Sequence, residues 1–313
     1  MPTHPPRVSV IIPTYKRADL VLSAVRSVLD QSTPPYEIVV VNDGSPDDTH
    51  QRLKPLADAG NIRYLSQENA GQSAARNRGF AASSGEYVAF LDDDDLFAPG
   101  KLAWQIEALH SDPNAALVYG TLQGISGAGG TLADTNTRGK NNWWIEDGVS
   151  GDVWGAFARK NRIISPGQCL IRRDALLSLG DGPLDNSLWG CEDHDLWLRL
   201  SARYPFRFEQ RPALYYRLHD TNASRDQPRL TQNTCRMCEK LLAQETDPGR
   251  RESLRRLLRS SRDSFAFQTL RAVRRRSAPR PTPEMIREAW KYVRPRVLLR
   301  LLKVILLEKT GAM

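Results

Sequence analysis

Four adjacent carboxylates directly follow a short apolar run, and their position suggests metal chemistry. Residues 87–91 are apolar and strand-forming, and the acids that follow them are Asp92, Asp93, Asp94 and Asp95. A short apolar run bounded by turn signals is typical of a buried parallel strand, and open α/β sheets bind ligands at the carboxyl ends of such strands. Because adjacent acids repel one another, the group requires a cation or hydrogen-bond donors. Its hard oxygens suit Mg²⁺ or Mn²⁺ with phosphates as further ligands, whereas a solvated acidic loop is the alternative.

Polar residues also follow two earlier runs of strand-forming residues. They are Pro13, Thr14 and Tyr15 after the first run, and Asp43, Gly44 and Ser45 after the second. All of them lie just beyond the carboxyl end of an expected strand, so we expect them to share one crevice with the four acids. In that crevice Asp43 can accept hydrogen bonds from a base or a ribose, and Gly44 lets a ligand approach the backbone closely. Ser45, which a proline follows, also has the pattern of a helix N-cap.

Strands and helices must alternate to position these residues. We expect strands at 8–12, 37–41, 61–66, 115–122, 165–171 and 214–219, and helices at 19–31, 71–82, 101–110 and 173–179. This alternation predicts an α/β fold, with a mostly parallel sheet flanked by helices in a Rossmann-like arrangement. However, no G-x-G-x-x-G follows the first strand and no P-loop motif occurs, which argues against dinucleotide-dependent dehydrogenases and P-loop NTPases.

A long connection is expected within the second half of this region. Residues 126–140 are rich in Gly, Thr and Asn and predict a loop. Trp143 and Trp144 follow it, and they could stack on sugar rings or pack against the protein.

Four segments stand out when they are taken together and in order, namely VSVIIPTY at 8–15, VNDGS at 41–45, NAGQSAARN at 69–77 and FLDDDD at 90–95. Together they resemble the family 2 glycosyltransferases with the GT-A fold. The resemblance covers about residues 8–224. It implies an inverting enzyme that moves a sugar from a nucleotide diphosphate sugar to an acceptor hydroxyl, in the assembly of a cell-surface polysaccharide or glycoconjugate. It also implies a divalent cation, Mn²⁺ or Mg²⁺, as the cofactor.

The same resemblance divides the chain into parts. It implies a GT-A domain over residues 1–225, with the nucleotide-sugar half at about 1–125 and the acceptor half at about 126–225. Residues 226–313 then form a basic α-helical C-terminal extension. The expected partners are the donor, for which UDP is favoured over GDP or dTDP, and a saccharide or lipid-linked saccharide as the acceptor.

Roles for the donor-side residues follow from the matching motifs. Thr14, Tyr15 and Asp43 line the nucleoside pocket, to which the neighbouring Pro13, Gly44 and Ser45 also belong. Arg76 lies near the base and phosphates, although it and Asn77 could also be solvated residues of an amphipathic helix. Asp92, Asp93 and Asp94 match the D-x-D motif of the family, in which the middle acid faces the ribose and Asp94 contacts the metal. Asp95 is a surplus acid, read as structural or as a helix N-cap.

Two acids on the acceptor side precede apolar residues at helical spacing. Glu192 and Asp193 would lie in the first turn of that helix, where acids also suit the helix dipole. The segment resembles the E-D motif of the family, which makes Asp193 the candidate base that takes the acceptor's proton. Glu192 then holds the acceptor or orients the base. By the same resemblance His219 completes the metal shell or touches the diphosphate, and the alternative is a histidine that packing alone satisfies.

Positive charge is concentrated in the last part of the chain. Residues 249–313 hold 18 Lys or Arg and 5 Asp or Glu, a net charge of +13, whereas the whole chain carries +8. Helices are expected at 230–246, 250–276 and 283–309, the last of them kinked at Pro295. The basic, apolar helix at 283–309 suits the surface of an anionic membrane, and packing on the protein itself or in a dimer is the alternative. Nucleic acid is not an expected partner, because no aromatic-interleaved basic module accompanies the charge.

Other features of the composition bound the class of protein. The four cysteines, Cys169, Cys191, Cys235 and Cys238, form no disulfide framework, and one C-x-x-C without a second pair does not make a zinc site. We found no apolar signal-peptide core and no run of about 18 apolar residues. The expected location is therefore the cytoplasm, with contact at the inner face of the cell membrane through the basic helix.

Two other functions remain open at this point. One is a non-catalytic subunit that binds a nucleotide sugar or serves in assembly. The other is a sugar-1-phosphate nucleotidyltransferase, which is disfavoured because the residues after the first strand contain no glycine-rich phosphate loop. The acids Asp94 and Asp193 favour the transferase over the subunit.

Overall fold

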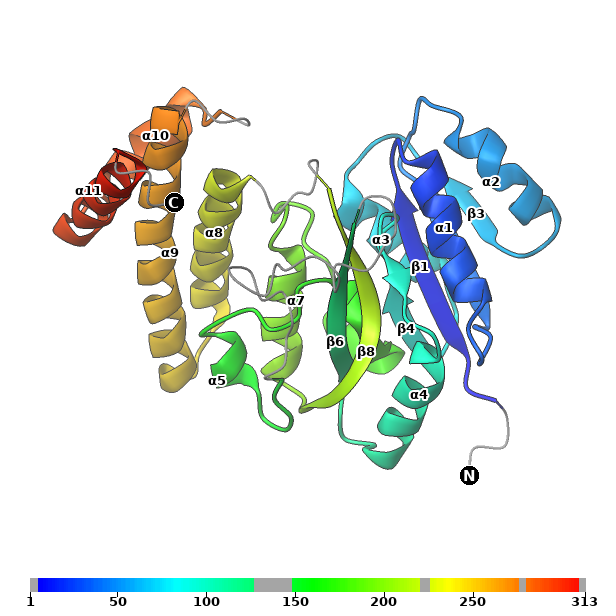
Figure 1. Ribbon diagram of the computed structural model, residues 1–313. Coiled ribbons are helices and arrows are strands. Elements are labelled where there is room, and N and C mark those ends of the chain that lie inside the picture. Colours follow the sequence, from blue (N-terminus) through cyan, green and yellow to red (C-terminus); the bar gives the residue numbers. More distant parts are fainter. Residues whose placement is uncertain (1–4, 127–147, 220–225, 276–279, 310–313) are drawn as a thin grey trace. The chain divides into compact units, whose positions relative to one another are not determined.

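A computed structural model describes residues 5–126, 148–219, 226–275 and 280–309 (Figure 1). The predicted loop at 126–140 and the two adjacent tryptophans after it fall almost wholly outside these ranges. The chain forms two compact units. The first comprises Met1–Asn186 and Glu192–His219, and the second comprises Ser187–Cys191 and Asp220–Met313.

The first unit is built on one sheet, and the mostly parallel α/β sheet predicted from the sequence is confirmed. In the described residues the strand order is β3-β2-β1-β4-β7-β6-β8-β5. The strands are β1 (Val8–Thr14), β2 (Glu37–Asn42), β3 (Arg63–Ser66), β4 (Tyr87–Phe90), β5 (Leu96–Phe97), β6 (Leu117–Ser126), β7 (Cys169–Arg172) and β8 (Phe206–Leu218). Strands β1 to β4 pair in parallel, as do β6 and β8, whereas β7 runs antiparallel to both its neighbours and β5 antiparallel to β8.

Helices flank this sheet, and the four expected at 19–31, 71–82, 101–110 and 173–179 lie close to their predicted bounds. The helices are α1 (Ala18–Leu29), α2 (Thr49–Asp58), α3 (Gln72–Ala82), α4 (Lys101–Ser111), α5 (Trp154–Phe157), α6 (Arg173–Leu177), α7 (Glu192–Ser201) and the 3₁₀ turn η3 (Pro166–Gln168). The N-cap predicted at Ser45 is wrong, because α2 begins only at Thr49. The Ser45 hydroxyl instead accepts a hydrogen bond from the Lys16 N–H at 3.0 Å, which ties together the ends of β1 and β2.

Alternate residues of the central strand β1 face opposite layers, as strand geometry requires. Val10 and Ile12 belong to the same buried cluster as Val25 of α1. Ile11, between them, faces α3, where an added Cβ on Gly79 would fall inside its van der Waals contact distance. Helices therefore cover both faces of β1, and α3 approaches the sheet closely because it presents a glycine there.

Strand register brings the polar ends of three strands to one edge of the sheet. The Asp43 N–H donates to the Thr14 carbonyl at 2.9 Å, and the Leu91 N–H donates to the Ile11 carbonyl at 3.0 Å. Strands β2, β1 and β4 are neighbours in the sheet and therefore finish side by side. The convergence predicted from the sequence is confirmed.

The second unit is helical, in agreement with the prediction of a helical C-terminal extension. Its helices are α8 (Gln227–Gln244), α9 (Pro248–Arg275), α10 (Pro283–Trp290) and α11 (Pro295–Lys309). Helices α8 and α9 lie side by side (Figure 1). The prediction of one helix kinked at Pro295 is wrong: α10 ends at Trp290, and Pro295 begins a new helix, where its missing N–H has no cost.

The segment Ser187–Cys191 belongs to this second unit although it lies between two parts of the first. The Trp189 carbonyl accepts a hydrogen bond from Asn233 Nδ2 at 2.8 Å, and the Arg229 guanidinium lies 4.0 Å from the centre of the Trp189 ring. Cys191 Sγ lies 3.3 Å from the Thr234 hydroxyl. The segment is thus anchored along α8. In the described residues of both units, no helix is long and apolar enough to cross a membrane.

Candidate active site

Three carboxylates at the end of β4 form a group that could hold a metal ion. One oxygen from each of Asp92, Asp94 and Asp95 lies within 4.8 Å of the others. The backbone turns just after β4, where the Asp95 N–H donates to the Asp92 carbonyl at 3.1 Å, and this turn gathers the side chains. Asp94 is 9% exposed and Asp95 1% exposed, so a solvated acidic loop is ruled out. Oxygen donors this close together fit a hard divalent cation.

Asp95 ties this group to the opposite half of the sheet. Its Oδ1 accepts a hydrogen bond from the Arg217 N–H of β8 at 2.9 Å, and its Oδ2 accepts one from the Ser165 hydroxyl at 3.3 Å. Burial, followed by the charges of Asp94 and Asp92, raises the pKa of Asp95 well above its ordinary value. It is not a helix N-cap, because α4 begins after Gly100. Of the two roles predicted for Asp95, the contacts therefore support the structural one.

His219 reaches the same group from the end of β8. Its Nε2 lies 2.9 Å from Asp94 Oδ2. A histidine beside a candidate carboxylate ligand can complete a metal site, and here it can also hold that carboxylate in place.

Two arginines balance the negative charge of the motif. Arg17 Nη1 donates to Asp93 Oδ1 at 2.9 Å and to Asp94 Oδ2 at 2.5 Å. Arg76, which is 2% exposed, forms ion pairs with Asp92 and, at 3.2 Å, with Glu192. Burial raises the pKa of Asp93 to about 6, although the nearby Arg17 opposes the shift. Arg17 was not among the candidate residues predicted from the sequence.

Burial and contacts exclude the solvated interpretation of Arg76 and Asn77. Arg76 is enclosed by acids on both sides, and Asn77 exchanges hydrogen bonds with the backbone of Leu184, donating at 2.8 Å and accepting at 3.1 Å. Helix α3 thus binds one acid of each motif through a single guanidinium and also anchors the segment before α7.

The residues that follow β2 are held by contacts with the loop that precedes α3. The Asp43 carboxylate accepts hydrogen bonds from the Ala70 and Gly71 N–H groups, both at 2.9 Å, so it fixes the loop that precedes α3. Gly44 has a φ of +75°, and a Cβ there would lie 2.9 Å from the Asn69 nitrogen. The close approach that calls for glycine at position 44 is therefore made by the protein's own loop before α3.

The end of β1 contacts the acidic motif directly. The Tyr15 N–H donates to Asp93 Oδ2 at 3.3 Å, while the preceding Pro13 and Thr14 complete the buried strand. The Tyr15 side chain is 39% exposed, which leaves its ring available to a ligand.

The two acids of the second motif begin α7, as predicted. Asp193 Oδ1 accepts a hydrogen bond from the His194 N–H at 2.7 Å. Glu192 is 6% exposed, and its Oε2 has no hydrogen-bond partner among the described residues. Burial, then the charge of Glu192, raises the pKa of Asp193 to about 8, against the opposing charge of Arg76. A carboxyl group with a pKa near neutrality is suited to exchange protons with a substrate.

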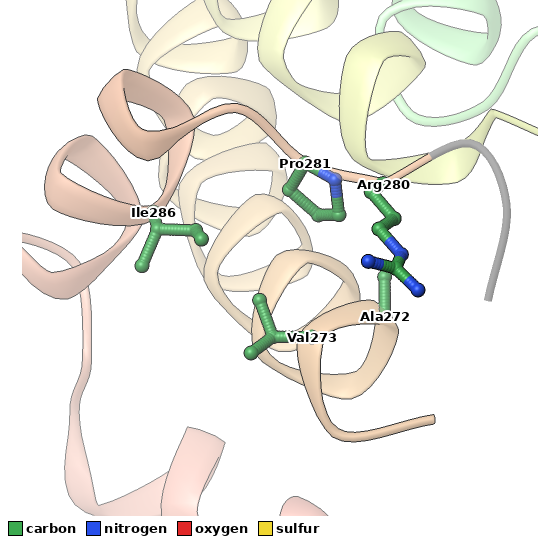
Figure 2. A pocket seen from close by; sticks show the side chains of 5 residues that line it. All are labelled: Ala272, Val273, Arg280, Pro281 and Ile286. Atoms are coloured by element: carbon green, nitrogen blue, oxygen red, sulfur yellow. The ribbon is translucent and has the colours of Figure 1, made fainter. Parts of the chain in front are cut away.

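A separate pocket of about 300 Å³ lies within the helical unit. Figure 2 shows that Val273 of α9 and Ile286 of α10 line it, with Arg280 and Pro281 from the segment between them. It contains none of the residues selected from the motifs, so the candidate site is the acidic edge of the sheet.

The sequence of this chain is similar to those of known glycosyltransferases. The model of glycosyl transferase family 2 matches residues 9–180, more than half of the chain. An uncharacterized glycosyltransferase of Rickettsia bellii is 37% identical over 197 residues, which are 63% of this chain and 26% of that protein. Chondroitin synthase of Escherichia coli is 27% identical over 223 residues, 70% of this chain and 30% of that protein. The chain thus spans less than a third of the length of either relative.

Solved structures share the fold. S. aureus TarS, residues 1–349 in complex with UDP, aligns with a TM-score of 0.62 and 18% identity, over 93% of this chain and 82% of that one. The mannosyltransferase PcManGT of Pyrobaculum calidifontis, in complex with GDP-Man and Mn²⁺, aligns with a TM-score of 0.58 and 19% identity, over 89% and 78%.

Proposed function

The chain belongs to glycosyl transferase family 2, and on that premise we propose that it transfers a sugar from a nucleotide diphosphate sugar to an acceptor hydroxyl with inversion. The observation that carries the proposal is the meeting of two acidic motifs around Arg76. One motif offers a metal and diphosphate site, and the other offers a carboxyl group with a pKa near 8.

On the donor side, oxygens of Asp92, Asp94 and Asp95 lie at a spacing that fits a divalent cation, and we assign Asp94, with His219 beside it, as the metal ligand. Mn²⁺ or Mg²⁺ bound there would neutralise charge that develops on the leaving diphosphate. Tyr15, with its exposed ring, and the neighbouring ends of β1 and β2 then hold the nucleoside. The contacts support an indirect part for Asp43, because it fixes the loop that leads into α3.

On the acceptor side, the carboxylate of Asp193 takes the proton of the acceptor hydroxyl. As that oxygen forms its bond to the anomeric carbon, the bond from this carbon to the diphosphate oxygen breaks, and the configuration inverts. Glu192 is held by Arg76 through one oxygen, so its other, unpartnered oxygen can accept a hydrogen bond from the acceptor.

The comparisons support a nucleotide sugar as the donor, because TarS binds UDP and PcManGT binds GDP-Man. We favour a UDP sugar. Chondroitin synthase, to judge from its name, makes a polysaccharide, which supports a saccharide or lipid-linked saccharide as the acceptor and a role in polysaccharide assembly.

We further propose that the helical unit contacts an anionic membrane at its cytoplasmic face. Its surface includes four large apolar side chains that are roughly half exposed, namely Trp290, Leu298, Leu299 and Leu302. Exposed Arg300 and Lys303 lie beside these leucines on α11. Half-exposed leucines bordered by cations match the acyl chains and phosphates of an anionic bilayer surface.

Nucleotide binding with Asp94→Ala tests the donor site. Calorimetry with UDP, GDP and dTDP, each with and without Mn²⁺, should show a metal-dependent gain in affinity for at least one nucleotide in the wild-type protein. Asp94→Ala should lose that gain while its circular dichroism spectrum stays unchanged. A variant that still binds the nucleotide with the full Mn²⁺ enhancement would exclude the site. Release of nucleoside diphosphate from a panel of nucleotide sugars then identifies the donor.

A further inference from the structure

Arg17 occupies the place where a cation would be expected beside the acidic motif. Its Nη1 contacts Asp93 at 2.9 Å and Asp94 at 2.5 Å, and the Asp94 oxygen it contacts is the one that also faces His219. The Arg17 side chain is 29% exposed, whereas those of Asp93 and Asp94 are 7% and 11% exposed. The guanidinium therefore closes the solvent side of acids that are otherwise largely buried.

The backbone before Arg17 is built to keep it there. Lys16 has a φ of +57°, a conformation that is uncommon for a residue other than glycine. Two hydrogen bonds hold the backbone that leads into this turn, from the Tyr15 N–H to Asp93 and from the Lys16 N–H to Ser45. The turn thus fixes the base of the Arg17 side chain, while the exposed end of that side chain is free to change partner.

A divalent cation and this guanidinium cannot share the acids at low cost. Two positive charges a few ångströms apart repel strongly at the edge of a protein, by an amount that corresponds to a change in affinity of about tenfold or more. Arg76 cannot make room, because it is 2% exposed and ion-paired at both ends. Arg17, with an exposed side and a single nitrogen in contact, is the group that can move.

We propose that Arg17 is a resident counter-ion of the acidic motif, which a divalent cation displaces from Asp94 and which then pairs with the diphosphate of the donor. This inference rests on the proposed metal-dependent transferase function. Its consequence is that cation and nucleotide bind cooperatively. The cation alone must break the ion pairs of Arg17 without replacement, whereas the diphosphate supplies new acceptors for the guanidinium.

Mn²⁺ binding to the protein without nucleotide provides a direct test. Arg17→Gln removes the competing charge, so we expect it to bind Mn²⁺ alone about tenfold more tightly than the wild type, as measured from the electron paramagnetic resonance signal of free Mn²⁺. Mn²⁺ should also raise the melting temperature of Arg17→Gln more than that of the wild type. This gain remains measurable if the unbalanced acids make the variant unstable without metal.

Nucleotide titrations test whether Arg17 pairs with the diphosphate of the donor. In saturating Mn²⁺, Arg17→Gln should bind the tightest wild-type nucleotide, UDP or GDP, about tenfold more weakly. The factor by which nucleotide strengthens Mn²⁺ binding should therefore fall at least tenfold. Arg17→Lys keeps the positive charge and should retain an Mn²⁺ affinity near that of the wild type. Arg52→Gln, which removes a cation from the separate pair with Asp19 on the surface, should behave as the wild type.

The outcomes separate this inference from the function on which it rests. If Asp94→Ala abolishes Mn²⁺ binding but Arg17→Gln leaves the affinity unchanged, the metal site stands and the role of Arg17 is refuted. An equal gain in Arg17→Lys, or in Arg52→Gln, would also overturn it. If neither the wild type nor Arg17→Gln binds Mn²⁺, even with nucleotide, both proposals fail.

Discussion

Asp193 lies in the first turn of α7. Burial, followed by the charge of Glu192, raises the pKa of its carboxyl group to about 8, so the ionised fraction increases with pH through neutrality. Because a general base must be ionised, the rate should rise with pH up to about 8 and then level off. We expect kcat/KM of the free enzyme to follow this curve, with its midpoint near pH 8.

Asp193→Asn tests the same assignment. The amide keeps the size of the side chain but cannot take a proton, so transfer should fall by about 10²–10⁴-fold while nucleotide affinity stays within a few-fold. Glu192→Gln should cost less if its role is to orient. Single-turnover transfer and nucleotide titration measure the two quantities separately. Near-normal transfer by Asp193→Asn would place the base elsewhere, and loss of folding would assign the first-turn acids to structure.

At the level of single residues, the sequence predicted the acids better than their partners. Asp92, Asp94 and Asp193 stand out because their motifs are local. The hydrogen bond from the Arg217 N–H to Asp95 spans 122 positions, and the ion pair between Arg17 and Asp94 spans 77. Such contacts depend on how strands are ordered in the sheet. Arg17 could have been noted as a cation that immediately follows the polar end of the first strand.

Helix α4 contains a lysine whose charge is suppressed by its surroundings. Lys101 is fully buried, and its Nζ donates to Gln105 Oε1 at 2.5 Å and to the Cys169 carbonyl at 3.0 Å. Burial lowers its pKa to about 7. Because the unfolded chain keeps this proton up to about pH 10, the free energy of unfolding should increase as pH rises from 7 and be lost as pH falls toward 7.

Lys101→Met should remove this dependence. Urea denaturation at pH 7 and pH 9 should show a wild-type gain of about 2 kcal/mol that is absent in the variant. Lys54→Met, at an exposed lysine paired with Asp58, serves as the control and should keep the gain. Equal pH dependence in wild type and Lys101→Met would mean that Lys101 is charged in the folded state.

Helix α3 must lie close to β1 to place Arg76 between the two acidic motifs. Gly79 allows this approach, since a Cβ would clash with Ile11 and lie 3.2 Å from Val41 Cγ2. We expect Gly79→Ala to destabilise the protein by about 1–3 kcal/mol, because strain in the core outweighs the better helix propensity of alanine. Urea denaturation measures this change. Arg78→Ala, on the exposed side of the helix, should change stability by less than about 0.5 kcal/mol.

The sequence predicted which segments form strands and helices better than it predicted the direction of the strands or the residues at which the helices begin and end. Apolar runs identified the buried strands, but nothing in residues 165–171 indicates that β7 lies antiparallel between β4 and β6. The missed start of α2 has a physical cause, since Ser45 is engaged by Lys16 rather than by a helix. The break between α10 and α11 was read as a kink, because a proline at an interior position and one at a first turn look alike in sequence.

At the scale of the whole chain, the strongest signal was the uneven distribution of charge, with +13 in residues 249–313. Composition separates the basic helices from the α/β unit. It could not show which apolar residues of α11 are covered. Val297 is 2% exposed and packs with Phe267, whereas Leu298, Leu299 and Leu302 are 46%, 66% and 55% exposed.

This exposure permits a sharper test of membrane contact than removal of the tail. Deletion of residues 297–313 should release the protein from anionic vesicles, but it also removes the buried Val297. Replacing Leu298, Leu299 and Leu302 together with serine leaves that packing intact and should lower vesicle binding by about tenfold or more. Leu177→Ser, at an exposed leucine of α6, is the control. If the full-length protein does not sediment with anionic vesicles at low salt, the membrane proposal is wrong.

The short segment Ser187–Cys191 has a consequence for how this protein could be recombined with its relatives. It is anchored along α8 yet runs directly into Glu192 and Asp193. A chimera that exchanged only the residues after His219 would keep Trp189 but replace Arg229 and Asn233, the side chains that hold it. A chimera with a single crossover keeps these contacts only if the crossover lies before Ser187, and it then also carries α7. The acids that we assign to the acceptor and the helices that we assign to the membrane are consequently inherited together.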